Sequence, residues 1–175
     1  MKLKHFDIDG QARFITFCTH NQLPLLSDNK IRRIILDIIL DAKKQYGFKL
    51  IAYVLMPEHV HLILIPNENS KVGHIIGEIK RLSSKKIHKY LILQKSKLIK
   101  KLTVIRNGAE RFVFWRKRCY DHNCRSEESL WEKVNYCHNN PVKRGLVQSP
   151  EKWQWSSYQY YRCNEVSPLN IDIIG

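Results

Sequence analysis

The sequence predicts an α+β domain in which helices pack on an antiparallel sheet. Residues 12–19 are rich in aromatic and β-branched side chains, which favours a strand. Isoleucines recur at helical spacing over 31–42, and apolar runs at 50–56 and 60–65 indicate two buried strands. Only three residues, 57–59, join those two runs, so we expect an antiparallel hairpin. The order strand, helix, strand, strand fits an antiparallel sheet with helices covering one of its faces.

Capping and turn residues place the ends of these elements. Residues 27–29 are of the types that cap helix N-termini, so we expect the helix over 31–42 to begin there. Gly47 is of the type that ends a helix. Prolines bound the two hairpin strands, with Pro57 after the first and Pro66 after the second. A second helical stripe of apolar residues follows over 75–82.

The C-terminal half is less regular. Residues 92–111 are rich in lysine and weakly patterned, so we expect a loop or loose hairpin there, and then a short edge strand over 111–115. Ser126 begins a helix that we expect to end near Asn140, because the proline that follows restricts the residue before it. The tail, about 146–175, carries two tryptophans and is expected to pack on the core.

Length and composition predict one domain spanning residues 1–175. The hydrophobic content of 43% is ordinary for a globular protein, and the five cysteines include no CxxC pair. No apolar stretch approaches the ~20 residues of a membrane helix, and the first residues lack the apolar run of a signal peptide. We therefore expect reduced thiols, a cytoplasmic location and no membrane partner.

Basic residues are concentrated in the middle third of the chain, whose overall formal net charge is +14. Residues 71–125 hold 16 basic and 3 acidic side chains, whereas 1–70 hold 9 and 7, and 126–175 hold 5 and 6. Such a block favours a polyanionic partner over a uniformly solvated surface. It lacks the apolar face that insertion into an acidic membrane would require.

His59 and His61 are two residues apart on a predicted strand, so their side chains point to the same side. Two adjacent imidazoles are a ready pair of metal ligands. Two half-buried histidines bonded to backbone or water would give the same pattern, so a third ligand is needed to decide between the readings.

Tyr136 lies off the apolar stripe of its predicted helix. At about 100° per residue, Leu130, Val134 and Cys137 share a narrow stripe that should face the core, and Tyr136 falls well outside it. Asn140 follows one turn later on the side of Tyr136. If this helix packs beside the histidine strand, one turn supplies a nucleophile and a third metal ligand. The alternative is an exposed tyrosine followed by a C-terminal cap.

Four stretches in a fixed order form a specific signature: LMPEHVHL at 55–62, VNYCHNNPVKRG at 134–145, and the segments 114–122 and 153–158. The first resembles the HUH motif of single-tyrosine transposases. The second resembles the tyrosine helix of the REP-associated tyrosine transposases, a bacterial branch related to insertion-sequence transposases. The chain departs from the family pattern at Arg116, where glutamine is expected, and over 92–110, which is longer and more basic.

The resemblance implies a ferredoxin-like core whose sheet presents the histidines. It implies that Tyr136 attacks a DNA phosphate and that His59, His61 and Asn140 bind Mg²⁺ or Mn²⁺, which suit such ligands better than Zn²⁺ does. Family members act on single-stranded palindromic repeats folded into hairpins, which implies a nucleoid-associated protein. Both a monomer and a homodimer, with the tyrosine supplied by the partner subunit, stay open.

A free tyrosine has a pKa of about 10, and a nearby dication favours its phenolate. Attack on DNA would leave a 5′-phosphotyrosine and a free 3′-hydroxyl, which can rejoin strands without ATP. Aromatic residues such as Trp115 and Tyr120 are candidates for stacking on unpaired bases. The side chains expected to bind the phosphate backbone are Lys80, Arg81, Lys85, Arg116, Lys117, Arg118, Arg125, Lys143 and Arg144.

Two alternative functions remain at this point. One is a DNA-hairpin binding protein that keeps the fold without cleaving. The other is a metal-dependent nuclease that uses water at the histidine pair and needs no tyrosine.

Overall fold

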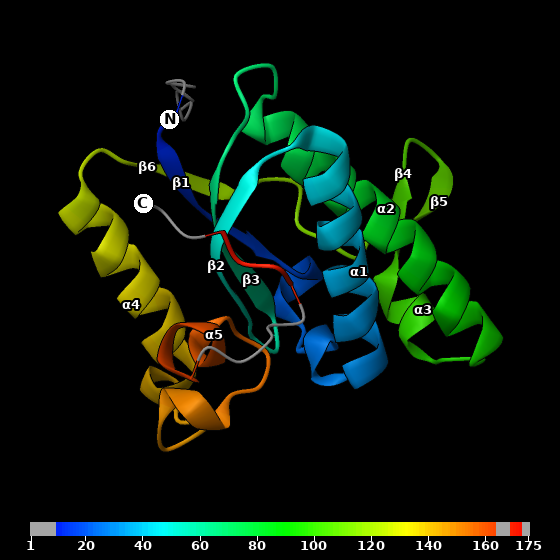
Figure 1. Ribbon diagram of the computed structural model, residues 1–175. Coiled ribbons are helices and arrows are strands. Elements are labelled where there is room, and N and C mark those ends of the chain that lie inside the picture. The colour runs from blue at the N-terminus through cyan, green and yellow to red at the C-terminus, as the bar shows by residue number, and fades with distance from the viewer. Residues whose placement is uncertain (1–9, 164–168, 173–175) are drawn as a thin grey trace.

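A four-stranded antiparallel sheet with strand order β2-β3-β1-β6 organises the chain (Figure 1). The structure, a computed structural model, describes residues 10–163 and 169–172. Strand β1 pairs with β3 and β6, and β2 pairs with β3, all antiparallel. The strands of this sheet are β1 (Ala12–Cys18), β2 (Lys49–Leu55), β3 (His59–Ile65) and β6 (Tyr120–Cys124).

Helices join and cover these strands. The main elements follow one another along the chain as β1, a helix, β2, β3, a second helix and β6. This is a ferredoxin-like arrangement, and it confirms the predicted α+β class. The α-helices are α1 (Asn29–Tyr46), α2 (Val72–Leu93), α3 (Leu98–Leu102), α4 (Glu127–Lys143) and α5 (Tyr158–Cys163), and the short 3-10 helices are His20–Gln22, Leu25–Ser27 and Pro150–Lys152.

Helices lie on both faces of the sheet, so the prediction that they cover one face was wrong. Figure 1 shows α1 and α2 on one side and α4 on the other. Along β3, Val60, Leu62 and Leu64 belong to the core under α1 and α2, whereas Ile63 belongs to the core under α4. The physical reason is that β2 and β3 are apolar at nearly every position, which leaves two faces to be buried.

The ends of α1 and the start of α4 follow the capping residues. The Asp28 side chain accepts hydrogen bonds from the backbone N–H groups of Lys30 and Ile31, and Gly47 ends α1 in the left-handed conformation at φ 64°. At α4, the Ser126 hydroxyl accepts from the N–H of Ser129. These contacts confirm the predicted boundaries.

The C-terminal end of α4 differs from the prediction, because the helix continues through Pro141 to Lys143. Proline has no N–H to donate to the Cys137 carbonyl one turn earlier, yet backbone hydrogen bonding resumes after it. The N–H of Arg144 donates to the Asn140 carbonyl at 3.0 Å, and that of Leu146 donates to the Pro141 carbonyl at 2.9 Å. The helix therefore extends beyond Asn140 and carries that side chain inside a regular turn.

Residues 92–111 form a folded protrusion where we predicted a loop or loose hairpin. The protrusion consists of the end of α2, the short α3 and a two-stranded sheet of β4 (Thr103–Arg106) and β5 (Ala109–Phe112). The edge strand expected at 111–115 is thus displaced to β5, which pairs with β4 rather than with the main sheet. The main sheet gains β6 instead, a strand that the sequence analysis did not predict.

The C-terminal segment runs along the free edge of β2. The N–H of Leu55 donates to the Trp155 carbonyl at 2.8 Å, and the N–H of Ser157 donates to the Tyr53 carbonyl at 3.0 Å. The guanidinium of Arg32 lies between the rings of Trp153 and Trp155, about 5 Å from each centroid. Parts of the predicted tail, 164–168 and 173–175, and residues 1–9 lie outside the described residues. In the described part of the chain, no helix has the length and apolar character needed to cross a membrane.

Candidate active site

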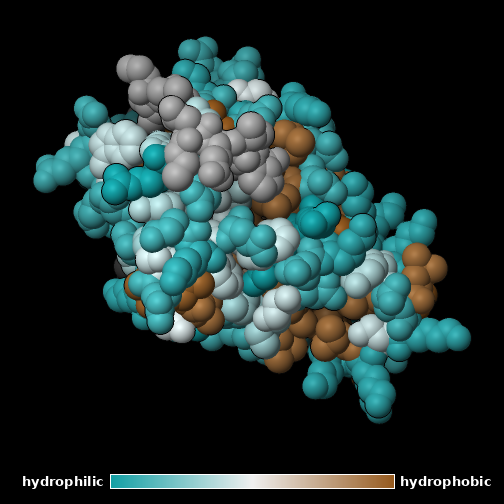
Figure 2. Space-filling model, turned by 60° about the horizontal axis from the view of Figure 1, so that its bottom comes forward, coloured by the Kyte–Doolittle hydropathy of each residue, from teal (hydrophilic) through white to brown (hydrophobic). Residues whose placement is uncertain are grey.

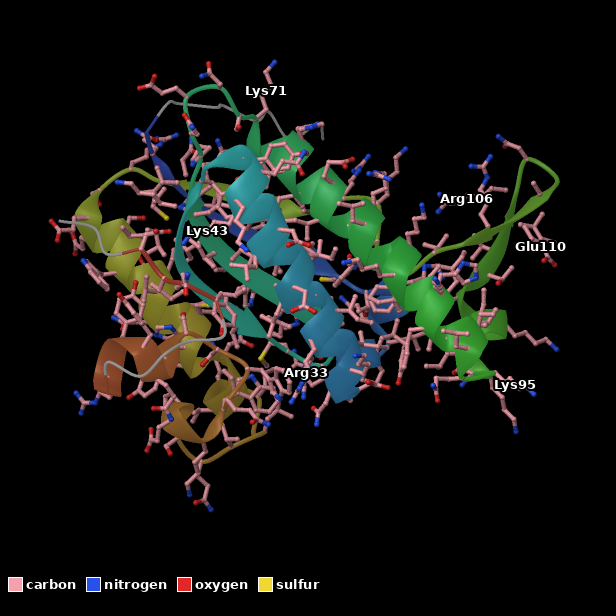
Figure 3. The ribbon with its side chains drawn as sticks, turned by 45° about the vertical axis from the view of Figure 1, so that its right-hand side comes forward. Arg33, Lys43, Lys71, Lys95, Arg106 and Glu110 are labelled. Atoms are coloured by element: carbon pink, nitrogen blue, oxygen red, sulfur yellow. The ribbon has the colours of Figure 1, made fainter. Side chains whose placement is uncertain are left out.

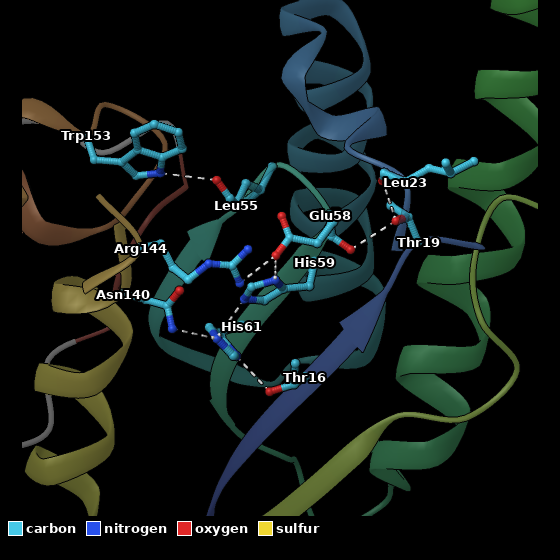
Figure 4. A network of polar contacts seen from close by, with 10 residues as sticks. All are labelled: Thr16, Thr19, Leu23, Leu55, Glu58, His59, His61, Asn140, Arg144 and Trp153. Atoms are coloured by element: carbon cyan, nitrogen blue, oxygen red, sulfur yellow. Dashed lines mark hydrogen bonds and ion pairs between the residues drawn. The ribbon is translucent and has the colours of Figure 1, made fainter. Parts of the chain in front are cut away.

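Two histidines on β3 face α4 (Figure 4). The period of the strand turns His59 and His61 to the same side, as predicted, and both are buried, with 8% and 4% of their surface exposed. Their Nε2 atoms lie 3.0 Å apart. The two imidazole nitrogens therefore converge on one point between the sheet and the helix.

Each histidine is held through its other ring nitrogen. The Nδ1 atom of His59 lies 3.0 Å from the Glu58 carboxylate, and Nδ1 of His61 lies 2.7 Å from the Thr16 hydroxyl. A carboxylate only accepts hydrogen bonds, so His59 must donate from Nδ1, and in the neutral ring its Nε2 then carries a lone pair. Such an arrangement orients a histidine to bind a cation through Nε2.

Burial keeps both rings neutral at physiological pH. Burial lowers the pKa of His61 to about 3, with a smaller contribution from neighbouring His59. Burial also lowers the pKa of His59, partly offset by the Glu58 carboxylate. Neutral imidazole is the form that coordinates metal ions.

Helix α4 brings Tyr136 and Asn140 to the histidines, as predicted. The ring of Tyr136 packs edge-on against those of His61 and Phe14, with centroids 5.6 and 5.9 Å apart, and 42% of the residue remains exposed. Asn140 is buried, and its Nδ2 lies 3.4 Å from Nε2 of His61. The tyrosine and both histidines thus meet within one chain.

The Asn140 side chain has an unused acceptor. Its Oδ1 is buried and has no hydrogen-bond partner among the described residues. A half turn about the Cβ–Cγ bond exchanges the amide oxygen and nitrogen, which places the oxygen toward His61. An orphaned acceptor of this kind needs a donor or a cation.

These observations fit a hard divalent cation. Two ligand atoms bound side by side to an octahedral ion at about 2.1 Å lie about 3.0 Å apart, the separation of the two Nε2 atoms. The described residues contain no cluster of three His, Cys, Asp or Glu side chains that could hold a metal ion. A metal ion bound here would therefore need the Asn140 amide as its third protein ligand.

A surface hollow of about 530 Å³ opens beside the histidines. Its lining includes Thr16 and Cys18 of β1 together with Glu58, His59 and Arg144. The Arg144 guanidinium lies 2.9 Å from Glu58 and is half-exposed (Figure 4). The hollow has room for a nucleotide unit, and the positively charged Arg144 side chain lies at its rim.

The predicted phosphate-binding side chains divide into three kinds. Lys80 differs from the expectation, because its ammonium donates to the carbonyls of Arg116 and Lys117 at 2.5 and 3.2 Å and so supports that loop. Arg81 pairs with Glu78 on the surface of α2. The remaining side chains are all exposed: Lys85, Arg116, Lys117, Arg118, Arg125, Lys143 and Arg144.

The two candidate stacking residues have different surroundings. Trp115 is buried, packs edge-on against Phe17 and donates from Nε1 to the Ser83 hydroxyl at 2.9 Å, so it belongs to the core. Tyr120 is 50% exposed on β6, beside Phe14. Only Tyr120 of the two is available to a base.

Sequence reasoning missed Thr16 and Glu58. Thr16 pairs directly with His61 across β1 and β3, which only the strand register reveals. Glu58 precedes His59, and a carboxylate next to a candidate ligand is a signal that the sequence offered. His138 was also missed: it is buried on α4, and its Nε2 lies 2.8 Å from the Ser157 hydroxyl.

The protein therefore combines two features: a ferredoxin-like sheet with a histidine pair, and a helix that brings a tyrosine to that pair. Residues 11–104 match the model of the family described as IS200-like transposases, which is more than half of the chain. The chain belongs to this family.

Similar proteins agree with this assignment. The chain is 23% identical to a REP-associated tyrosine transposase of Escherichia coli strain K12 over 168 residues, 95% of this chain and 88% of that protein. It is also 23% identical to a candidate REP-associated tyrosine transposase of Haemophilus influenzae over 126 residues, 71% of this chain and 67% of the relative.

Two solved structures share the fold. One is described as a REP-associated tyrosine transposase bound to a REP hairpin, with a TM-score of 0.72 and 21% identity over 100% of this chain and 94% of the other. The second is a candidate transposase from Deinococcus radiodurans, with a TM-score of 0.51 and 19% identity over 79% of this chain and 97% of the other.

Proposed function

We propose that this protein cleaves and rejoins single-stranded DNA at palindromic repeat hairpins through a 5′-phosphotyrosine on Tyr136, with His59, His61 and Asn140 holding Mg²⁺ or Mn²⁺. Membership of the IS200-like transposase family supports DNA strand transfer as the class of reaction. The hairpin is supported by the structural neighbour, which is described as bound to one.

The observation that carries the proposal is the position of Tyr136 on α4. Its ring packs against His61, while Asn140, one helical turn later, lies against the same imidazole. A tyrosine that served only packing would lie with Val134 and Cys137 under the sheet, where both are buried. Tyr136 keeps an exposed side at the histidine pair instead.

The residues divide the chemistry among themselves. His59, His61 and Asn140 would hold the divalent ion, which would supply a Lewis acid for the scissile phosphate. Glu58 and Thr16 fix the imidazole orientations through Nδ1. Lys143, whose Nζ lies 5.8 Å from the Tyr136 ring centroid, adds positive charge beside the phenol.

In the reaction, the Tyr136 phenol loses its proton to solvent and its oxygen attacks the phosphorus. The bond from phosphorus to the 3′-oxygen breaks, and that oxygen takes up a proton as a 3′-hydroxyl. The 5′-phosphate stays on Tyr136 as a diester. Attack by a 3′-hydroxyl reverses these steps and releases the tyrosine, so rejoining needs no ATP.

The test uses hairpin-forming oligonucleotides taken from the DNA beside the gene for this protein, with single-stranded flanks and Mn²⁺. We expect an adduct that survives denaturation and is lost in Tyr136→Phe and with chelator. Tyr120→Phe is the matched control, because Tyr120 is a similarly exposed tyrosine. Cleavage that persists in Tyr136→Phe would identify a water-using nuclease, and tight binding without cleavage would identify a hairpin-binding protein.

A further inference from the structure

A strongly basic protrusion lies apart from the candidate active site. We call residues 85–111 the basic arm: the second half of α2, α3 and the β4–β5 hairpin. It contains one acidic residue, Glu110, against nine lysines and arginines. All nine are exposed: Lys85, Lys86, Lys89, Lys95, Lys97, Lys100, Lys101, Arg106 and Arg111.

These cations have no acidic partners among the residues that the structure describes. Within the part of the chain that the structure describes, none of the nine forms an ion pair with a carboxylate. Some cations elsewhere, such as Arg13, Lys43 and Arg144, do pair with an acid. Unpaired charges of one sign repel one another, so a surface that gathers them is suited to a polyanion.

The arm is folded, and its Ile87, Leu91 and Leu102 belong to the core under α1 and α2. The ring of His88 on α2 stacks on Phe112 of β5, with centroids 4.1 Å apart. The hairpin turns at Asn107 and Gly108, both at positive φ, which is the geometry of a tight two-residue β-hairpin. The cations therefore sit on a defined framework, and Figure 3 shows Lys95 and Arg106 at separate points of the protrusion.

The contacts between the arm and the hollow form a continuous path. Cys18 lines the hollow with His59, and its carbonyl accepts from the N–H of Arg116 at 2.9 Å. Lys80 of α2 binds the Arg116 carbonyl. From Lys80, α2 runs on to its last residue, Leu93, inside the basic arm, a length of about 20 Å.

That length corresponds to about six base pairs, since DNA rises about 3.4 Å per nucleotide along each strand. DNA with its single strand in the hollow and its duplex beside α2 would place stem phosphates against the arm. The exposed Ile92, Leu93 and Ile105 also lie here, and Figure 2 shows brown apolar atoms among protruding teal side chains at its right-hand end. Apolar side chains scattered among cations in this way are ordinary on a protein surface.

We propose that the basic arm binds the duplex stem of a DNA hairpin through its phosphates, without reading sequence. This inference rests on the proposed function, because it takes the hairpin from there. Phosphate contacts from lysine and arginine give affinity that falls steeply with salt.

The test compares two triple variants in a Tyr136→Phe background, where binding is measured without cleavage. The arm variant is Lys95→Gln, Lys100→Gln and Lys101→Gln. The control is Lys44→Gln, Lys49→Gln and Lys71→Gln, which removes the same charge from exposed lysines elsewhere. Figure 3 shows Lys71 beside the N-terminal end of α2 and Lys95 beyond its C-terminal end.

The ligands are a hairpin with a 12-base-pair stem and an oligonucleotide with the same flank and no stem. For the arm variant, we expect hairpin affinity to fall roughly tenfold to a hundredfold and the slope of log K against log salt to drop by about 2–3. Binding of the stemless strand should change no more than in the control.

Equal losses in both variants, or equal losses on both ligands, would overturn the inference. Anionic vesicles offer a further comparison: an arm variant that loses vesicle binding and keeps hairpin binding would assign the surface to membranes. Adduct formation by the protein with Tyr136 intact reports the proposed function separately. An arm effect without any adduct would leave stem binding in place and contradict cleavage, whereas an adduct without an arm effect would contradict only stem binding.

Discussion

The Arg144 guanidinium lies 2.9 Å from the same Glu58 carboxylate oxygen that accepts from His59 at 3.0 Å. This chain of contacts joins the end of the tyrosine helix to a histidine on β3 through one carboxylate. Glu58 is largely buried, whereas Arg144 is half-exposed and can meet a DNA phosphate. The pair therefore couples the orientation of the His59 imidazole, a candidate metal ligand, to the rim of the hollow.

Glu58→Ala removes the acceptor that orients His59. We expect the Mn²⁺ concentration at half-maximal adduct formation to rise about 10–100-fold, with cleavage recovering at saturating metal, because carboxylates behind a ligating histidine have effects of that size. The exposed Glu68→Ala is the control. A folded Glu58→Ala protein whose metal requirement is unchanged would contradict this role.

Asp121 is expected to be structural. Its carboxylate accepts hydrogen bonds from Nε and Nη2 of Arg13 at 2.9 and 2.6 Å, and both side chains are nearly fully buried. Removing one partner of a buried ion pair is strongly destabilising, so Asp121→Ala should cost about 3–5 kcal/mol in urea unfolding. Glu110→Ala, at an exposed carboxylate, should cost less than about 0.5 kcal/mol. Equal midpoints for the two variants would contradict the structural assignment.

Stability should fall in acid because of His138. Burial lowers the pKa of His138 to about 4, against 6.5 for the unperturbed group. Between these pH values the unfolded chain binds a proton that the folded chain does not, so unfolding becomes easier as pH falls.

The measurement is the free energy of unfolding at several pH values for the natural chain and for His138→Gln. The natural chain should lose roughly 3 kcal/mol more than the variant between pH 7 and pH 4. Parallel pH profiles would show that His138 contributes nothing to the acid sensitivity.

Much of the candidate site was predictable because its periodicities are local. Alternation along a strand put His59 and His61 on one side, and the helical period put Tyr136 and Asn140 off the apolar stripe. The ligand set and the metal itself stay predictions. Thr16 could not be found in this way, since it meets His61 only through the pairing of β1 with β3.

The elements that were missed depend on tertiary contacts. Strand β6 has the sequence Tyr-Asp-His-Asn-Cys, which has weak strand preference, and it forms because it pairs with β1 and brings Asp121 to Arg13. Helix α4 passes Pro141, and the N–H groups of Arg144 and Leu146 bond to the carbonyls of Asn140 and Pro141 beyond it. Helices cover both faces of the sheet because β2 and β3 are apolar on both sides, whereas the prediction placed helices on one face only.

The most direct test of the central claim is to find which residue carries the DNA. Protein incubated with a cognate hairpin and Mn²⁺ is digested with nuclease and protease, and the peptides are examined by mass spectrometry. We predict a nucleotide on Tyr136, in the peptide that also contains Asn140. A nucleotide on any other residue, or cleaved DNA with no modified peptide, would contradict the account.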